Sequence, residues 1–109
     1  MSHGIKDGRI YKGTNTSSVI GGIQKSRNRI YKGTSEGNIL GGVKGDRIYK
    51  GTSEGNILGG VKGDRIYKGT SEGATIMKTS VIHSAIKDSK NYDLALMVAA
   101  YHFLIKPIF

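Results

Sequence analysis

Short apolar runs recur along most of this chain and are separated by glycine, lysine and small polar residues. The core Ile-Tyr-Lys-Gly begins at Ile10, Ile30, Ile48 and Ile66, with spacings of 20, 18 and 18 residues. Residues 29–46 recur letter for letter at 47–64. Short β-branched and aromatic runs bounded by glycine-containing turns are typical of β-strands. The pattern therefore predicts a mainly β sheet built from four hairpin repeats of about 18 residues.

Each repeat contains two chain reversals. Gly63-Asp64 separates two strand-like runs and has the chemistry of a primed two-residue hairpin turn. Ser53–Asn56 is a second polar segment that contains glycine. A two-residue loop at the first reversal and a four-residue loop at the second both place a tyrosine opposite Gly60, Tyr67 from one side and Tyr49 from the other. Each tyrosine is thus expected to cover a glycine on both neighbouring strands.

The parity of the loops decides which side chains share a face. A shift of one residue reverses every side chain of a strand, so an odd loop without a compensating bulge would separate Ile48 from Val61. The even loop keeps Ile48, Ile57 and Val61 on one face. The other face then carries Tyr49 with Gly60.

A β-solenoid with 18-residue coils is the alternative fold. In a solenoid, equivalent residues stack about 4.8 Å apart, so each repeated lysine and arginine would lie beside its own copy. In an antiparallel meander, equivalent residues lie two strands apart, about 9.6 Å, which is close to a Debye length. The cationic repeats therefore favour the meander.

Glycine spacing within the repeat resembles that of MORN-type repeats, which are glycine-rich antiparallel hairpins. The residues that carry the resemblance are Tyr49-x-Gly51, Gly55 and Gly59-Gly60, and their equivalents extend over residues 9–73. The period here is shorter and the usual tryptophan is absent. The resemblance implies a scaffold that contacts lipid or protein and is not an enzyme.

The C-terminal segment, residues 79–109, differs from the repeats because it contains no glycine. The apolar run from Leu94 to Ile105 predicts a helix that ends near Lys106-Pro107, with Asp88, Ser89 or Asn91 as its cap. The run is shorter than the roughly twenty residues that a membrane span requires. The pattern leaves open whether residues 79–90 form a strand or a helix.

We expect a single domain over residues 1–109, with the sheet in 1–78 and the helical segment in 79–109. Apolar residues surround the predicted helix, so one contact surface would leave some of them in water. Either the sheet curls around the helix or the chain forms a homo-oligomer.

Seventeen lysine and arginine residues against eight acidic residues give a net charge of +9. This charge favours acidic partners such as nucleic acid, an anionic membrane surface or an acidic protein. Cysteine is absent, which excludes disulfides and thiolate metal sites. The N-terminal residues contain no apolar run of the secretory type, so we expect a cytoplasmic protein.

Candidate functional residues are few. His3, His83 and His102 show no ligand spacing, and no catalytic, metal or cofactor motif is discernible, so none is predicted. The candidate binding surface consists of the repeated tyrosines and arginines, on which bases could stack while cations meet phosphates: Tyr11, Tyr31, Tyr49, Tyr67, Arg9, Arg29, Arg47 and Arg65. The competing interpretation is that the tyrosines cover glycines and the arginines solubilise strand ends.

Two functions fit these observations. The first is a non-enzymatic β-repeat module that self-associates and binds another protein. The second is a basic surface that binds nucleic acid or an anionic membrane through its tyrosine, arginine and lysine rows.

Overall fold

The computed structural model describes residues 3–24 and 27–109, and most of them belong to one β-sheet. In chain order the strands are β1 (His3–Lys6), β2 (Arg9–Lys12), β3 (Val19–Gln24), β4 (Arg29–Lys32), β5 (Ile39–Lys44), β6 (Arg47–Lys50), β7 (Ile57–Lys62), β8 (Arg65–Lys68), β9 (Thr75–Lys78) and β10 (Ile86–Lys87). β1 lies ahead of the first Ile-Tyr-Lys-Gly core and pairs with β2.

The sheet is a meander in which β1 to β9 pair in chain order and every one of these pairs is antiparallel. The short β10 adds to β1 in parallel, which gives ten strands in all. Successive repeats do not stack in one direction, so the solenoid alternative is wrong. Among the described residues β9 and β10 are the two edges, and the sheet is not closed.

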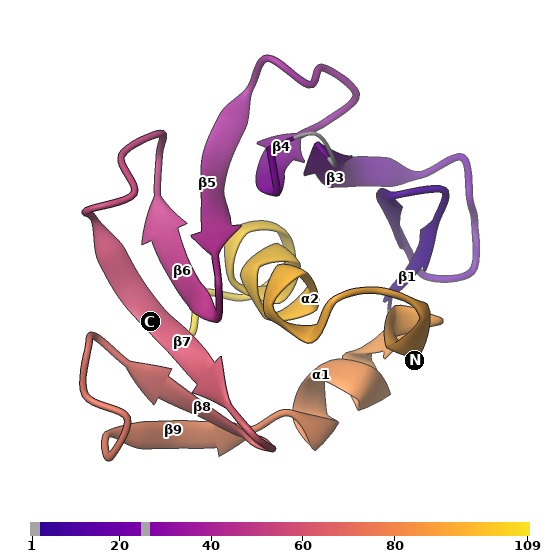
Figure 1. Ribbon diagram of the computed structural model, residues 1–109. Helices are drawn as coiled ribbons and strands as arrows, with labels where there is room; N and C mark the ends of the chain where they lie inside the picture. Colours follow the sequence, from indigo (N-terminus) through magenta and orange to yellow (C-terminus); the bar gives the residue numbers. More distant parts are fainter. Residues whose placement is uncertain (1–2, 25–26) are drawn as a thin grey trace.

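Figure 1 shows the strands curling around one central helix, α2 (Leu94–Ala100). A second helix, α1 (Ser80–Ala85), lies in the gap between the edge strands β9 and β10 and contacts both. The sheet and α1 together surround α2. Of the two arrangements predicted for the apolar helix, the structure has the curled sheet.

The two-residue hairpin turns are confirmed, including their primed geometry. Gly45 and Gly63 have φ values of 62° and 61° and each precedes an aspartate, as in a type II′ turn. At the first hairpin both Asp7 and Gly8 have positive φ, as in a type I′ turn. Across these turns the predicted register holds, with Tyr67 opposite Gly60.

The register across the longer loop differs from the prediction. Tyr49 lies opposite Ile57, not Gly60, because a β-bulge shifts the pairing between Ile48 and Tyr49. Equivalent bulges occur in the other repeats. The pairing skips Leu58, so the loop is not the even loop that the parity argument selected. As a result Ile57 lies on the same face as Tyr49 and not on the face of Ile48. The predicted reversal at Ser53–Asn56 is itself a turn, since Asn56 N donates to Ser53 O at 3.0 Å.

The C-terminal segment contains both elements that the sequence left open. Residues 79–90 include α1 and β10 and lead into a 3₁₀ turn, η1 (Ser89–Asn91). The predicted helix begins at Leu94, the first residue of the apolar run, but its cap is Asp93 and not Asp88, Ser89 or Asn91; the Asp93 side chain accepts a hydrogen bond from Ala95 N at 2.9 Å. It continues as a π-helix, η2 (Tyr101–Ile105), and ends before Lys106. No helix in the described part of the chain is both long and apolar enough to cross a membrane.

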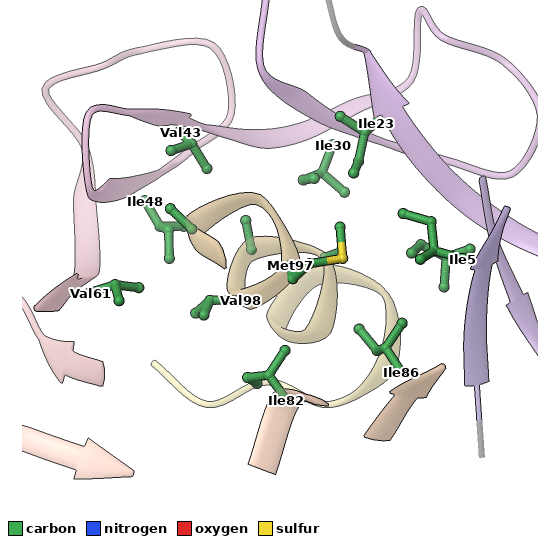
Figure 2. Packing of buried hydrophobic residues seen from close by; sticks show 14 of the residues in the cluster. Ile5, Ile23, Ile30, Val43, Ile48, Val61, Ile82, Ile86, Met97 and Val98 are labelled. Carbon is green, nitrogen blue, oxygen red and sulfur yellow. The ribbon is translucent and has the colours of Figure 1, made fainter. Parts of the chain in front are cut away.

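The core lies between the concave face of the sheet and α2. Figure 2 shows Met97 and Val98 of α2 surrounded by isoleucine and valine side chains from the sheet, and by Ile82 and Ile86. Met97 and Val98 are completely buried. Because the curl covers α2 from several sides, much of the apolar surface that suggested an oligomer is buried within one chain, whereas Phe103, Leu104 and Ile105 remain partly exposed.

Candidate functional site

The repeated strand Arg-Ile-Tyr-Lys sorts its side chains between the two faces of the sheet. The isoleucines face α2 and are completely buried, so by alternation the arginines and tyrosines belong to the outer face. The tyrosine rings are covered as well, with exposed fractions of 7, 3, 1 and 3% for Tyr11, Tyr31, Tyr49 and Tyr67. Arg9, Arg47 and Arg65 are exposed and Arg29 is half-buried.

Each of the four repeated tyrosines lies across a glycine of the preceding strand, which is Gly4 for Tyr11 and the second glycine of a Gly-Gly pair for the other three. A Cβ atom at Gly42 would overlap the hydroxyl of Tyr49, and one at Gly60 would overlap that of Tyr67. The prediction that tyrosines cover glycines is therefore confirmed for one of the two neighbouring strands. On the other strand the tyrosine meets an isoleucine, as a consequence of the bulge.

On the outer face, three of the four repeated arginines lie close to the tyrosine of the next repeat. One groove, of about 480 Å³, contains Arg9 and Tyr31, and another, of about 500 Å³, contains Arg47 and Tyr67. Between them, Arg29 Nε donates to the Tyr49 hydroxyl at 3.3 Å. We call these three Arg–Tyr pairs and their surroundings the lateral grooves. Of the predicted site residues, Arg65 has no following repeat, and Tyr11 borders a separate cavity of about 430 Å³.

Several acidic side chains line the lateral grooves, namely Asp7, Glu36, Asp46 and Glu72. Glu54 pairs with Lys44 at 3.5 Å and Glu72 pairs with Lys62 at 3.3 Å. The four paired side chains are more than half exposed, so these pairs add little to stability. Within residues 3–24 and 27–109 no ion pair joins a carboxylate to any of the four repeated arginines. The guanidinium groups therefore keep most of their donors for solvent or for a ligand.

A second surface was not among the predicted sites. Each repeated strand ends in an exposed lysine two residues after the buried isoleucine, so alternation places these lysines on the concave face, at the rim: Lys12, Lys32, Lys50 and Lys68. The cross-strand partners of the last three are Gly21, Gly41 and Gly59. Added Cβ atoms at these glycines would meet Leu104, Phe103 and Phe109 respectively.

These contacts define two ends of the molecule. We call the rim around η2 and the C-terminal residues the lysine end. The opposite rim carries the two-residue turns. At this rim Gly8 N donates to the hydroxyl of Tyr92, a residue that lies just before α2 in the chain, at 3.2 Å. We call it the turn end. Alternation along Arg-Ile-Tyr-Lys was the signal in the sequence that could have revealed the lysine end.

Two histidines have structural partners. His83 Nδ1 is 2.7 Å from Ser89 Oγ, beside a cavity of about 290 Å³ that Asp88 also lines. Ser89 is only 1% exposed, so its hydroxyl is closed to a substrate and the bond links α1 to η1. His102 Nδ1 accepts the N–H groups of Ile108 and Phe109 at 2.9 and 3.3 Å. Burial lowers the pKa of His102, which favours the neutral acceptor form.

Lys12 lies opposite His3, where burial and the lysine charge together lower the pKa of the imidazole. In the part of the chain that the structure describes, no three histidine, cysteine or acidic side chains gather in a group that could hold a metal ion.

A family profile described as "6-fold beta flower protein" matches residues 3–99. The chain belongs to this family. The beta flower assignment replaces the MORN resemblance, although both are β-hairpin repeat architectures, so the predicted type of repeat was right. Comparison with curated proteins gave no significant match, and neither did comparison with solved structures. The beta flower of this chain is thus a small repeat β module.

Proposed function

We propose that this beta flower is a non-enzymatic interaction module whose lateral grooves bind an acidic segment of a protein partner. The observation that supports the proposal most directly is that the groove arginines are available for a ligand. Arg9 and Arg47 border open cavities, and none of the three groove arginines forms an ion pair with a carboxylate among the described residues.

The chemistry of a groove suits a carboxylate side chain. A guanidinium group offers planar, paired donors that match the two oxygens of a carboxylate. The tyrosine hydroxyl lies beside it, as Arg29 and Tyr49 show, and can donate a further hydrogen bond. Equivalent grooves are two strands, or about 9.6 Å, apart along the sheet. A flexible acidic segment can therefore occupy more than one groove and gain affinity through multivalency.

Nucleic acid fits this surface less well than an acidic polypeptide does. Recognition of single strands depends on bases that stack on aromatic faces. The four tyrosine rings are at most 7% exposed and lie against glycine backbone. The arginines could still meet phosphates, so single-stranded DNA belongs in the test as the competing ligand.

The test measures the binding of labelled poly-glutamate and of a single-stranded DNA oligonucleotide by fluorescence anisotropy at low salt. In the groove variant Arg9, Arg29 and Arg47 are changed to glutamine. The matched control changes Lys12, Lys32 and Lys50 to glutamine, which removes the same charge from the lysine end. We expect poly-glutamate to bind about tenfold more weakly to the groove variant than to the control, since one lost charge-assisted hydrogen bond accounts for such a factor.

Three results would contradict the proposal. Equal weakening by both variants would mean that only net charge matters. Absence of poly-glutamate binding at low salt would exclude acidic polypeptides as ligands of the lateral grooves. Tighter binding of DNA than of poly-glutamate, lost in the groove variant, would assign the grooves to nucleic acid.

Self-association remains a prediction, and the exposed apolar residues suggest where two copies would meet. Ile76 on the edge strand β9 and Val81 in α1 are 39 and 40% exposed, and they are the large apolar side chains that stand out to solvent in the described ranges. An edge strand presents unpaired backbone groups to which another chain can add. We therefore propose the β9 edge as the contact between copies.

A further inference from the structure

The lysine end combines apolar and cationic groups in a way that the lateral grooves do not. Phe103, Leu104, Ile105, Ile108 and Phe109 are packed against the core but remain partly exposed. Their backbone is held at this end because His102 binds the N–H groups of the last two residues. The exposed lysines 12, 32, 50 and 68 lie around them, and the exposed Lys106 follows η2.

We propose that the lysine end docks on a lipid bilayer that contains anionic headgroups. The lysines would contact the phosphate and carboxylate groups of the lipids, and the apolar residues of η2 and the C-terminal segment would enter the interface. This inference uses a different surface from the lateral grooves, so its failure would leave the proposed function untouched.

The charges of the lysine end are not neutralised within the chain. Both ion pairs formed by the described residues involve Lys44 and Lys62, which belong to the lateral grooves. Asp64 lies in a two-residue turn and Asp93 caps the start of α2, so these carboxylates belong to the turn end, whereas Asp46 also lines a lateral groove. Glu36, Glu54 and Glu72 lie in the longer loops that follow the lysines, but Glu54 and Glu72 pair with Lys44 and Lys62, and Glu36 lines a lateral groove. No ion pair among the described residues therefore involves a lysine of the lysine end.

A membrane surface fits this combination better than a second copy or a nucleic acid. Two lysine ends facing each other would bring like charges together, which opposes a symmetric dimer. A nucleic acid would satisfy the lysines but would leave the central apolar residues without a role. Clustered lysines around apolar side chains that enter the headgroup region are typical of proteins that lie on anionic membranes. Lysine stems can also cover apolar surface while their ammonium groups reach the headgroups.

The lysines also have a structural explanation that the test must separate. They lie near the C-terminal end of the central helix, where cations complement the negative end of the helix dipole. If this were their only role, replacing them would lower thermal stability and would have no selective effect on lipid binding.

The test is co-sedimentation of the full chain with vesicles of phosphatidylcholine, with and without one quarter phosphatidylserine. The lysine-end variant changes Lys32, Lys50 and Lys68 to glutamine. The matched control changes three exposed turn-end lysines, Lys6, Lys78 and Lys90, and has the same net charge. We expect binding only to the anionic vesicles, weakened about fivefold per lysine and thus about a hundredfold in the lysine-end variant. The control should bind nearly as well as the natural chain.

A fluorescence measurement on a second variant keeps the proposal testable if the triple variant is unstable. The chain contains no tryptophan, so Ile105→Trp provides a single reporter at the lysine end and Val81→Trp a control on α1. We expect a blue shift with anionic vesicles for Ile105→Trp alone, reversed as salt rises from about 0.05 to about 0.5 M. Equal losses in the two lysine variants, equal binding to neutral vesicles, or no shift at residue 105 would each overturn the proposal.

Discussion

The Gly-Gly pair of each repeat allows a quantitative prediction for Gly60→Ala. A Cβ atom at this position would lie 2.6 Å from Tyr67 Cζ and 2.7 Å from the carbonyl oxygen of Asp46. The carbonyl cannot move away freely, because it accepts a hydrogen bond from Val61 N at 2.9 Å. The tyrosine ring can move only by leaving a site where it is 3% exposed. The substitution must therefore strain the sheet or expose the ring.

Both responses have similar costs. If the ring stays, overpacking of a close contact costs about 1–3 kcal/mol. If it swings out, a tyrosine that buries roughly 200 Å² loses about half of that area, which costs about 2.5 kcal/mol at 25 cal/mol per Å². We expect a loss of about 2–3 kcal/mol, against a total stability of roughly 5–15 kcal/mol for a domain of this kind.

Urea denaturation followed by circular dichroism measures this loss. With an m-value of roughly 1–3 kcal/mol per molar, the midpoint should fall by about 1–2 M. The matched control is Gly55→Ala in the same repeat, where the nearest atom is Ser53 Oγ at 3.9 Å, so stability should change by less than about 0.5 kcal/mol. The double variant Gly60→Ala, Tyr67→Ala should lose less than the sum of its single changes. If Gly60→Ala is as stable as the Gly55 control, the tyrosine does not need its glycine and the reasoning is wrong.

Three further predictions concern the core, the C-terminal segment and self-association. Met97→Ala should destabilise the fold by about 2–5 kcal/mol in urea, since Met97 is completely buried against the isoleucines of the sheet. Partial burial holds the pKa of His102 below its ordinary value of 6.5, so its contribution to stability should be present above pH 6.5 and should be lost as the pH falls through the folded-state pKa. A pH series of urea midpoints should show this acid loss in the natural chain and a smaller loss in His102→Gln; equal losses would exclude the role of this imidazole. Light scattering should show an assembly larger than one 11.7 kDa chain, and the substitution Ile76→Lys should dissociate this assembly. A natural protein that stays at 11.7 kDa at all concentrations would refute self-association through β9.

The local features that the sequence predicted correctly are those fixed by two or three neighbouring residues. Gly63-Asp64 has one conformation that suits a twisted hairpin, so its turn and register followed directly. The longer loop admits either an even count or an odd count with a bulge, and nothing in Ser53–Asn56 distinguishes the two. The bulge, and with it the position of Ile57, required the structure.

The sequence predicted which residues share a face of the sheet, but not which arginine lies beside which tyrosine. Tyrosines and arginines do share the outer face, as their spacing within one strand implied. However, the partner of Arg29 is Tyr49 of the next repeat, and such a pairing depends on the curvature of the sheet. Curvature arises from the bulges and from packing on α2, neither of which a repeat pattern encodes locally.

The first glycine of each Gly-Gly pair explains how identical repeats can enclose a helix that does not repeat. Equivalent positions in the sheet face different residues of η2 and the C-terminal segment: Gly21 faces Leu104, Gly41 faces Phe103 and Gly59 faces Phe109. An added Cβ atom would also overlap the carbonyl oxygen of a tyrosine at each position, Tyr31, Tyr49 and Tyr67 respectively, so every repeat requires glycine there. The same glycine can face three different neighbours because the variable side chain comes from the C-terminal segment. The letter-for-letter duplication of residues 29–46 is therefore compatible with an asymmetric core, since the central helix supplies the differences that the strands lack.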